Sequence, residues 1–240
     1  MVYYSVIRKG NDELCHHGIL GMHWGIRRYQ NYDGTLTTAG KRHYSNNSEK
    51  LAQDIYARAN RGEKVITNHV KRAIGWAGGK MYGLENRQKT KESIARKIED
   101  NSKEKGITKD QAAKEVKDAL RYTSIRDNKN FVDTYFKTKD VLTRLGYKEV
   151  SCKNYFEKYK TGEAKHKQVT SVFENPSGMK FEIQFQTPES IKAKEKKTPI
   201  YEERRQFGIS ESRARELEQK MVELMDPIPY PKDIQKIKSH

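Results

Sequence analysis

The clearest pattern in the chain is a strict alternation of apolar and polar residues over positions 181–187. On an extended strand, the apolar face would carry Phe181, Ile183 and Phe185, and the polar face would carry Glu182, Gln184 and Gln186. A strand with one apolar face packs on a core. Its polar face is then either ordinary half-exposed surface or the wall of a site, because a carboxylate between amides suits a metal–phosphate site.

The segments before this strand predict an α+β unit. Residues 118–125 run from a helix end into a stretch rich in strand formers, and residues 147–155 and 169–173 are strand-like. Residues 131–145 have apolar positions at helical spacing, and the turn at 175–178 joins two strands into a hairpin. We therefore expect an α+β fold with a mixed sheet of about four to five strands flanked by helices.

A helix is expected to precede this unit. Apolar residues recur between positions 45 and 82 at helical spacing, and the inner row is Leu51, Ile55, Ala59, Val65, Val70 and Ile74. The glycines around Trp76 break the pattern. Trp76 itself is expected to anchor packing between helices rather than to stack on a base.

Capping signals predict the remaining helices. Gly106 is expected to end one helix and Thr108 to cap the next. Near the end of the chain, helices are expected to start at Pro188, at Thr198-Pro199 and after Ser210. The proline-rich residues 226–231 predict a loose tail.

Composition and charge narrow the possible functions. The chain has 240 residues, of which 34% are hydrophobic and 33% charged, with a net charge of +16. This composition predicts one modest core with long solvated helices, and a cationic surface favours polyanions. Two distant cysteines, Cys15 and Cys152, form neither a disulfide framework nor a zinc pattern. No apolar run suggests a membrane span or a signal peptide, so a reducing cytosol and no membrane partner are expected.

Residues 1–44 differ from the rest and hold four of the seven histidines. The spacing of Cys15, His16, His17 and His23 matches no standard zinc arrangement, so a structural metal is not expected there. The phrase His-His-Gly-Ile-Leu-Gly-Met-His-Trp-Gly at 16–25 resembles a leader near the N-terminus of phage and prophage proteins of Gram-positive bacteria. That resemblance covers about residues 10–44 and implies phage head proteins as partners.

Further phrases resemble, in their order, the synthetase (nucleotidyltransferase) domain of RelA/SpoT-type enzymes. They are the basic phrase from Arg87 to Lys97, Asp-Ala-Leu-Arg-Tyr-Thr at 118–123, Lys-Asn-Tyr at 153–155 and Glu-Ile-Gln-Phe-Gln-Thr at 182–187. The resemblance covers roughly residues 80–205 and is closest to compact versions attached to phage and polymorphic-toxin proteins. It divides the chain into a leader (1–44), a helical connector (45–82), the transferase domain (83–207) and a C-terminal helix with its tail (208–240).

The resemblance implies an ATP-dependent pyrophosphotransferase that uses Mg²⁺. A ribose hydroxyl would attack the β-phosphate of ATP, and AMP would leave. The implied roles are ATP phosphate binding by Arg87, Lys89, Ser93 and Lys97, Mg²⁺ binding by Asp118 and Glu182, a cationic role for Arg121, acceptor binding by Lys153 and Tyr155, and support of the carboxylate strand by Gln184. On the bare pattern, the basic helix face near residue 91 is more typical of a solvated surface than of a phosphate site.

The chain departs from the family pattern at three places. Asp118 is followed by Arg121 and Thr123 rather than by Gly and then Arg, the Gly-Tyr-x-Ser-x-His phrase is missing from 165–170, and Gln186 replaces an Arg. The acceptor therefore stays open between a nucleotide and an RNA 3′ end such as that of tRNA. One alternative is a non-enzymatic phage head-associated or ejected protein that reuses the fold, and another is a nucleic-acid-binding module. The expected location is the cytoplasm of a bacterial host or the virion.

Overall fold

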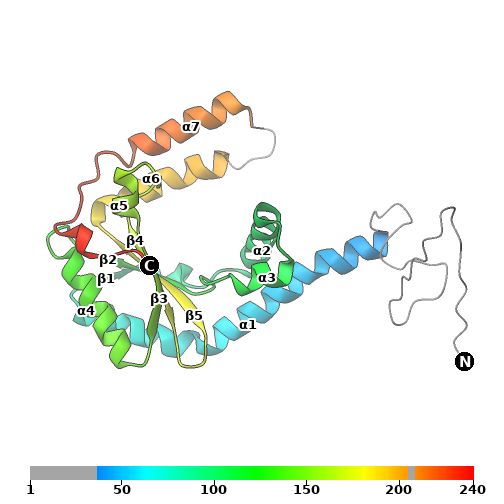
Figure 1. The fold of residues 1–240 in the computed structure, drawn as a ribbon, viewed down its shortest axis with the longest axis horizontal. Coiled ribbons are helices and arrows are strands. Elements are labelled where there is room, and N and C mark those ends of the chain that lie inside the picture. Colours follow the sequence, from blue (N-terminus) through cyan, green and yellow to red (C-terminus); the bar gives the residue numbers. More distant parts are fainter. Residues whose placement is uncertain (1–36, 205–208) are drawn as a thin grey trace, which may run out of the picture. The chain divides into compact units, whose positions relative to one another are not determined.

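The computed structural model describes residues 37–204 and 209–240 (Figure 1). Most of the leader phrase, with Cys15, His16, His17 and His23, lies outside these residues, as does the expected domain boundary at 207. The chain divides into two units between residues 47 and 48, and the second unit comprises 48–240. Helix α1 spans Thr38–Trp76, and its residues from Ser48 onward belong to the second unit.

Five strands within the described residues form one mixed sheet in the order β1-β2-β5-β4-β3. Their bounds are β1 (Lys80–Tyr82), β2 (Arg121–Ile125), β3 (Lys148–Asn154), β4 (Val169–Glu174) and β5 (Lys180–Gln186). Strands β2 and β5 are parallel, and the other neighbours are antiparallel. The α+β class and the β4–β5 hairpin expected from the sequence are confirmed.

The helices begin and end largely where the capping signals indicate. They are α2 (Lys91–Lys105), α3 (Lys109–Lys114), α4 (Phe131–Arg144), α5 (Tyr155–Lys160), α6 (Pro188–Arg204) and α7 (Glu211–Glu223), with short 3-10 turns η1 (Leu84–Asn86) and η2 (Ile234–Lys236). Gly106 ends α2 at a φ of +63°, and Thr108 forms a reciprocal capping box with Gln111. No helix in the described parts of the chain is long and apolar enough to cross a membrane.

The core lies against the apolar face of β5. Phe181, Ile183 and Phe185 are all at most 2% exposed. The Phe181 ring meets Tyr122 and Tyr147 edge to face, with centroids 5.9 and 5.4 Å apart. Helices α1 and α4 cover this face (Figure 1) with the buried residues Ile66, Val70, Ile74, Phe131, Tyr135 and Leu142. The polar face of the sheet is therefore left for other groups.

Two expectations about α1 are wrong. Trp76 is 64% exposed rather than packed between helices, and Val65 is 57% exposed rather than in the inner row. Ile66, Val70 and Ile74 face the sheet at four-residue intervals, so the helical rotation turns Val65 and Trp76 toward solvent. The helix ends at Trp76, where the glycines are expected to break the pattern, and residues 80–82 then form β1, which pairs with β2.

The predicted helix start at Thr198-Pro199 is also wrong, because α6 continues through Pro199. Proline lacks the N–H that would bond the carbonyl one turn earlier, so the helix continues without that hydrogen bond. The hydroxyl of Thr198 donates to the carbonyl of Lys194 at 2.8 Å and satisfies a neighbouring acceptor. As a result, α6 is a single element that starts directly after β5.

The C-terminal segment is packed, which corrects the expected loose tail. The Asn154 side-chain amide donates to the carbonyls of Ile234 and Ile237, both at 2.9 Å. His240 and Cys152 exchange two backbone hydrogen bonds of 2.9 and 3.0 Å. Prolines stop the helix before this segment, but buried isoleucines then hold it against β3 and α5.

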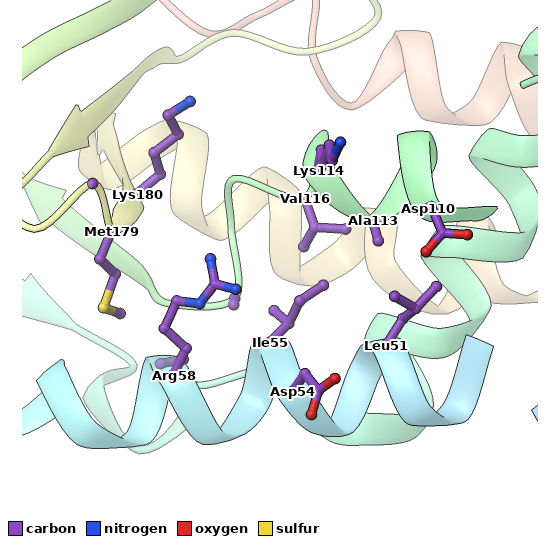
Figure 2. A pocket seen from close by; sticks show the side chains of 13 residues that line it. Leu51, Asp54, Ile55, Arg58, Asp110, Ala113, Lys114, Val116, Met179 and Lys180 are labelled. Carbon is purple, nitrogen blue, oxygen red and sulfur yellow. The ribbon is translucent and has the colours of Figure 1, made fainter. Parts of the chain in front are cut away.

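A cleft of about 390 Å³ lies between α1, α3 and the β4–β5 turn (Figure 2). Its apolar lining includes Leu51, Ile55 and Val116. Arg58 extends from α1 toward the space between Met179 and Val116. Neither of the predicted metal-binding carboxylates lines this cleft, so it is separate from the site described below.

Phe181→Ala should destabilise the fold by about 3–5 kcal/mol, because it removes a fully buried ring at the centre of the sheet. The measurement is the free energy of unfolding in urea. Phe136→Ala is the matched control, since Phe136 is 43% exposed, and it should lose much less. Equal losses for the two variants would contradict this placement of the core.

Candidate functional site

The polar face of the sheet carries two rows of side chains across its strands. In one row, Glu182 of β5 lies opposite Arg121 of β2. In the next row, Gln184 lies between Thr123 of β2 and Thr170 of β4. Lys153 of β3 lies opposite Thr170 and extends this second row. The alternation of β5 therefore places the predicted acid, amide and cations on one face, away from the core.

Asp118 lies just before β2 and is held by two lysines. Its carboxylate accepts hydrogen bonds from Lys89 Nζ at 2.6 Å and from Lys97 Nζ of α2 at 2.7 Å. Burial alone would raise the pKa of Asp118, but the charges of Lys97 and then Lys89 hold that pKa below its ordinary value. Asp118 is therefore an ionised carboxylate with both oxygens engaged.

Glu182 lies beside Asp118 in a different electrostatic environment. Burial and then the negative charge of Asp118 raise the pKa of Glu182. Gln184 Nε2 donates to Glu182 Oε1 at 2.7 Å, and this hydrogen bond together with Arg121 partly offsets the rise. The two carboxylate charges repel each other, and a cation bound by both would relieve the repulsion.

Helix α6 adds a second cationic side to the site. Lys194 Nζ donates to Gln184 Oε1 at 2.9 Å, so the amide joins this lysine to Glu182. Burial and then the charge of Arg121 lower the pKa of Lys194 to about 8, while Glu182 opposes the shift. The carboxylates thus lie between lysines of the α2 region and a lysine of α6.

Tyr155 and His166 form a ring pair at the edge of the site. Their centroids are 4.1 Å apart at an interplanar angle of 46°. Burial, followed by the charges of Lys197 and Lys194, lowers the pKa of His166 to about 4. Burial and then the charge of Glu182 raise the pKa of Tyr155. The charge of Glu182 therefore affects the pKa of Tyr155, and the charges of the α6 lysines affect the pKa of His166.

Most of the predicted site residues are brought together. Those on or beside the polar face are Asp118, Glu182, Lys89, Lys97, Arg121, Gln184, Lys153 and Tyr155. Arg87 instead pairs with Glu63 of α1. The backbone N–H of Ser93 donates to the side chain of Thr90, the N-cap of α2. The roles of all these residues remain predictions.

Sequence reasoning missed Lys194 and Lys197. Their position could have indicated a role in the site, because they lie on a helix that begins at Pro188, directly after β5. Such a helix folds back across the sheet, and Lys194 then reaches Gln184. Sequence alone does not show over which face of the sheet the helix returns.

The carboxylate pair suits magnesium better than zinc. Mg²⁺ prefers oxygen ligands and is usually bound by one or two carboxylates together with substrate phosphates and water. Asp118 and Glu182 supply two such groups, and the negative charge of Asp118, after burial, raises the pKa of Glu182. Within 37–204 and 209–240, no group of three or more His, Cys, Asp or Glu side chains forms a fuller metal cage.

Comparison with known proteins gives structural likenesses only. No family model and no curated protein match the chain. The type VI effector Tas1, solved in complex with its immunity protein, is 16% identical, with a TM-score of 0.47 over 78% of this chain and 98% of that chain. Small alarmone synthetase 1 of Bacillus subtilis, bound to its product pppGpp, is 17% identical, with a TM-score of 0.46 over 70% of this chain and 87% of that chain.

Small alarmone synthetase 2 of Bacillus subtilis is also 17% identical, with a TM-score of 0.47 over 72% of this chain and 90% of that chain. Scores and identities at this level do not assign the chain to a family.

Acid should destabilise the protein through His166. Its folded-state pKa of about 4 lies below the ordinary value of 6.5, so between these pH values the unfolded chain binds a proton that the folded protein does not. Stability should therefore fall as the pH is lowered from 6.5 toward 4. The check is the melting temperature of wild type and His166→Gln against pH. The wild type should show the steeper acid loss, and parallel curves would contradict a buried neutral His166.

Proposed function

We propose that this protein is a Mg²⁺-dependent transferase that moves pyrophosphate from ATP to a hydroxyl of a nucleotide or of an RNA 3′ end. The observation that carries the proposal is the carboxylate pair Asp118 and Glu182 on the polar face of the sheet, between lysines from two directions. Phosphoryl-type transfer needs cations around a phosphate chain and an oriented hydroxyl, and this arrangement meets the first need.

The residues would divide the work by position. Asp118 and Glu182 would hold Mg²⁺, which supplies charge neutralisation between phosphate oxygens. Lys89 and Lys97 lie on the α2 side and would bind the ATP phosphates with charge-assisted hydrogen bonds. Arg121 lies opposite Glu182, where it would stabilise negative charge on the transferred group. The bond from the acceptor oxygen to the β-phosphorus forms, the bond to AMP breaks, and the hydroxyl proton is lost to water.

The acceptor would lie on the β3 side of the face. Lys153 is exposed there, and Tyr155 follows at the start of α5. Lys153 matches the lysine beside the acceptor in the synthetase pattern. The Gly-Tyr phrase of that pattern is absent, and Tyr155 would stack on the acceptor base in its place. The resemblance of the leader and of the compact domain supports a phage-encoded, toxin-like protein in a bacterial cytoplasm.

One observation favours a second function, a non-enzymatic phage head-associated or ejected protein. Arg87, which the synthetase pattern assigns to ATP phosphates, is paired with Glu63 of α1. A site that has lost one phosphate ligand and the Gly-Tyr phrase is what an inactive descendant would retain. Turnover separates the two functions.

The deciding experiment is a transfer assay with Mg²⁺ and ATP labelled on the γ-phosphate, with GDP, GTP, ADP and bulk tRNA offered in parallel. Label on a nucleotide would identify an alarmone-type synthetase, and label on tRNA would identify an RNA-modifying toxin. If no acceptor is labelled by either the wild type or Glu182→Gln, the transferase proposal fails.

Asp118→Asn and Glu182→Gln should each lower turnover by about 100-fold or more while the fold stays intact, because each removes one proposed metal ligand. The measurements are the initial rate and the melting temperature. Glu174→Gln is the matched control, since Glu174 lies in the same hairpin and pairs with Lys180. It should retain wild-type turnover. Full activity in both site variants would disprove the metal assignment.

A further inference from the structure

Helix α6 carries two partly buried lysines, Lys194 and Lys197, whose ammonium groups donate to uncharged acceptors. Lys194 Nζ contacts the amide oxygen of Gln184 at 2.9 Å, and Lys197 Nζ contacts the backbone carbonyl of Lys165 at 2.5 Å. Both acceptors are neutral. Among the described residues, neither lysine has an acidic partner within ion-pair distance, although Lys165 itself pairs with Glu218.

This arrangement partly buries positive charge without a direct ion pair, and the charge of Glu182 only partly opposes the lowered pKa of Lys194. Burial is the largest cause that lowers the pKa of Lys194, and the charge of Arg121 adds to it. Burial followed by the charge of Lys165 lowers the pKa of Lys197. Partly buried ammonium groups normally have a charged partner, because removal from water is costly. An anion bound from outside would supply that partner.

The lysines on the other side of the carboxylates do not share this property. Lys89 and Lys97 both pair with Asp118, at 2.6 and 2.7 Å. Their charges are thus compensated when no metal is bound. Among the described residues, the partly buried lysines of the site without an ion pair are those of α6, where the charge of Arg121 also acts on Lys194.

We propose that Lys194, Lys197 and Arg121 form a phosphate subsite for the second substrate, distinct from the lysine pair at Asp118. The ligand is a phosphate mono- or diester or a diphosphate, carried by a free nucleotide or by an RNA 3′ end. This inference rests on the proposed function at one point: the bound anion is taken to be a phosphate of the second substrate. The acceptor must then carry phosphate, and a bare nucleoside is excluded.

Binding measured without metal tests this subsite separately. Lys89 and Lys97 then remain paired with Asp118 and are not free to bind the added phosphate. The experiment is calorimetric titration of the full chain in EDTA at low salt. The probes are GDP, ADP, guanosine, and a short single-stranded RNA with a 3′-hydroxyl. Lys194→Met should weaken binding of the phosphate-bearing ligand about tenfold, and Lys194→Arg should restore most of it.

Lys192→Met is the matched control, because Lys192 is an exposed lysine of the same helix. It should bind like the wild type, and the melting temperatures of all variants show whether each is folded. If Lys194→Met perturbs the fold, Lys197→Met tests the same subsite from one helical turn further along. Guanosine should bind far more weakly than GDP to every variant.

The outcomes distinguish a free nucleotide from an RNA end as the source of the phosphate. They also test the subsite independently of the transferase proposal. Dependence of GDP or ADP binding on Lys194 identifies a free nucleotide, and dependence of RNA binding alone identifies an RNA end. Wild-type affinity in both lysine variants, or equal binding of guanosine and GDP, overturns the subsite. Absence of turnover with Mg²⁺ would overturn the transferase and leave a Lys194-dependent binding result standing.

Discussion

The parallel pairing of β2 with β5 is the constraint on which the site depends. The N–H of Glu182 donates to the carbonyl of Leu120 at 3.0 Å, and this register sets Glu182 opposite Arg121. Asp118 comes three residues before Arg121 and so reaches the same edge of the face. Parallel neighbours need a long crossover, and α4, β3, α5 and β4 fill it between the two strands. The pairing of β2 with β5 thereby brings the carboxylates of Asp118 and Glu182 together, although they are far apart in the sequence.

Charged groups on this face differ in how far their neighbours neutralise them, and this difference separates a metal-binding side from an anion-binding side. Asp118 is neutralised by two lysines, whereas Glu182 is supported mainly by a neutral amide and by Arg121. On the α6 side, Lys194 donates to that same amide, and the charges of Arg121 and Glu182 act on it in opposite directions. The neutral amide of Gln184 thus links Glu182, which could bind a metal cation, to Lys194, which could bind an anion. A metal and a phosphate together would satisfy both groups.

The C-terminal segment supports the β3–α5 side of the face through a buried lysine. Lys167 is 3% exposed, and its ammonium donates to the carbonyls of Asp226 and Ile228 at 3.0 and 2.9 Å. The rings of Tyr159 and Tyr230 lie 4.6 and 4.5 Å from it. These contacts anchor the segment to α5, which begins with Tyr155. The final residues therefore help to position the acceptor side.

The sequence by itself determined the local parts of this protein. Alternation assigned Phe181 and Glu182 to opposite faces, and the capping residues set the ends of α2 and α3, because side-chain period and caps are properties of neighbouring residues. Only the tertiary structure decided that Arg87 turns to Glu63, that Trp76 faces solvent and that Lys194 reaches Gln184. Periodicity tells which face a residue occupies, but not which distant element covers that face. The partners of a charged side chain depend on such long-range packing.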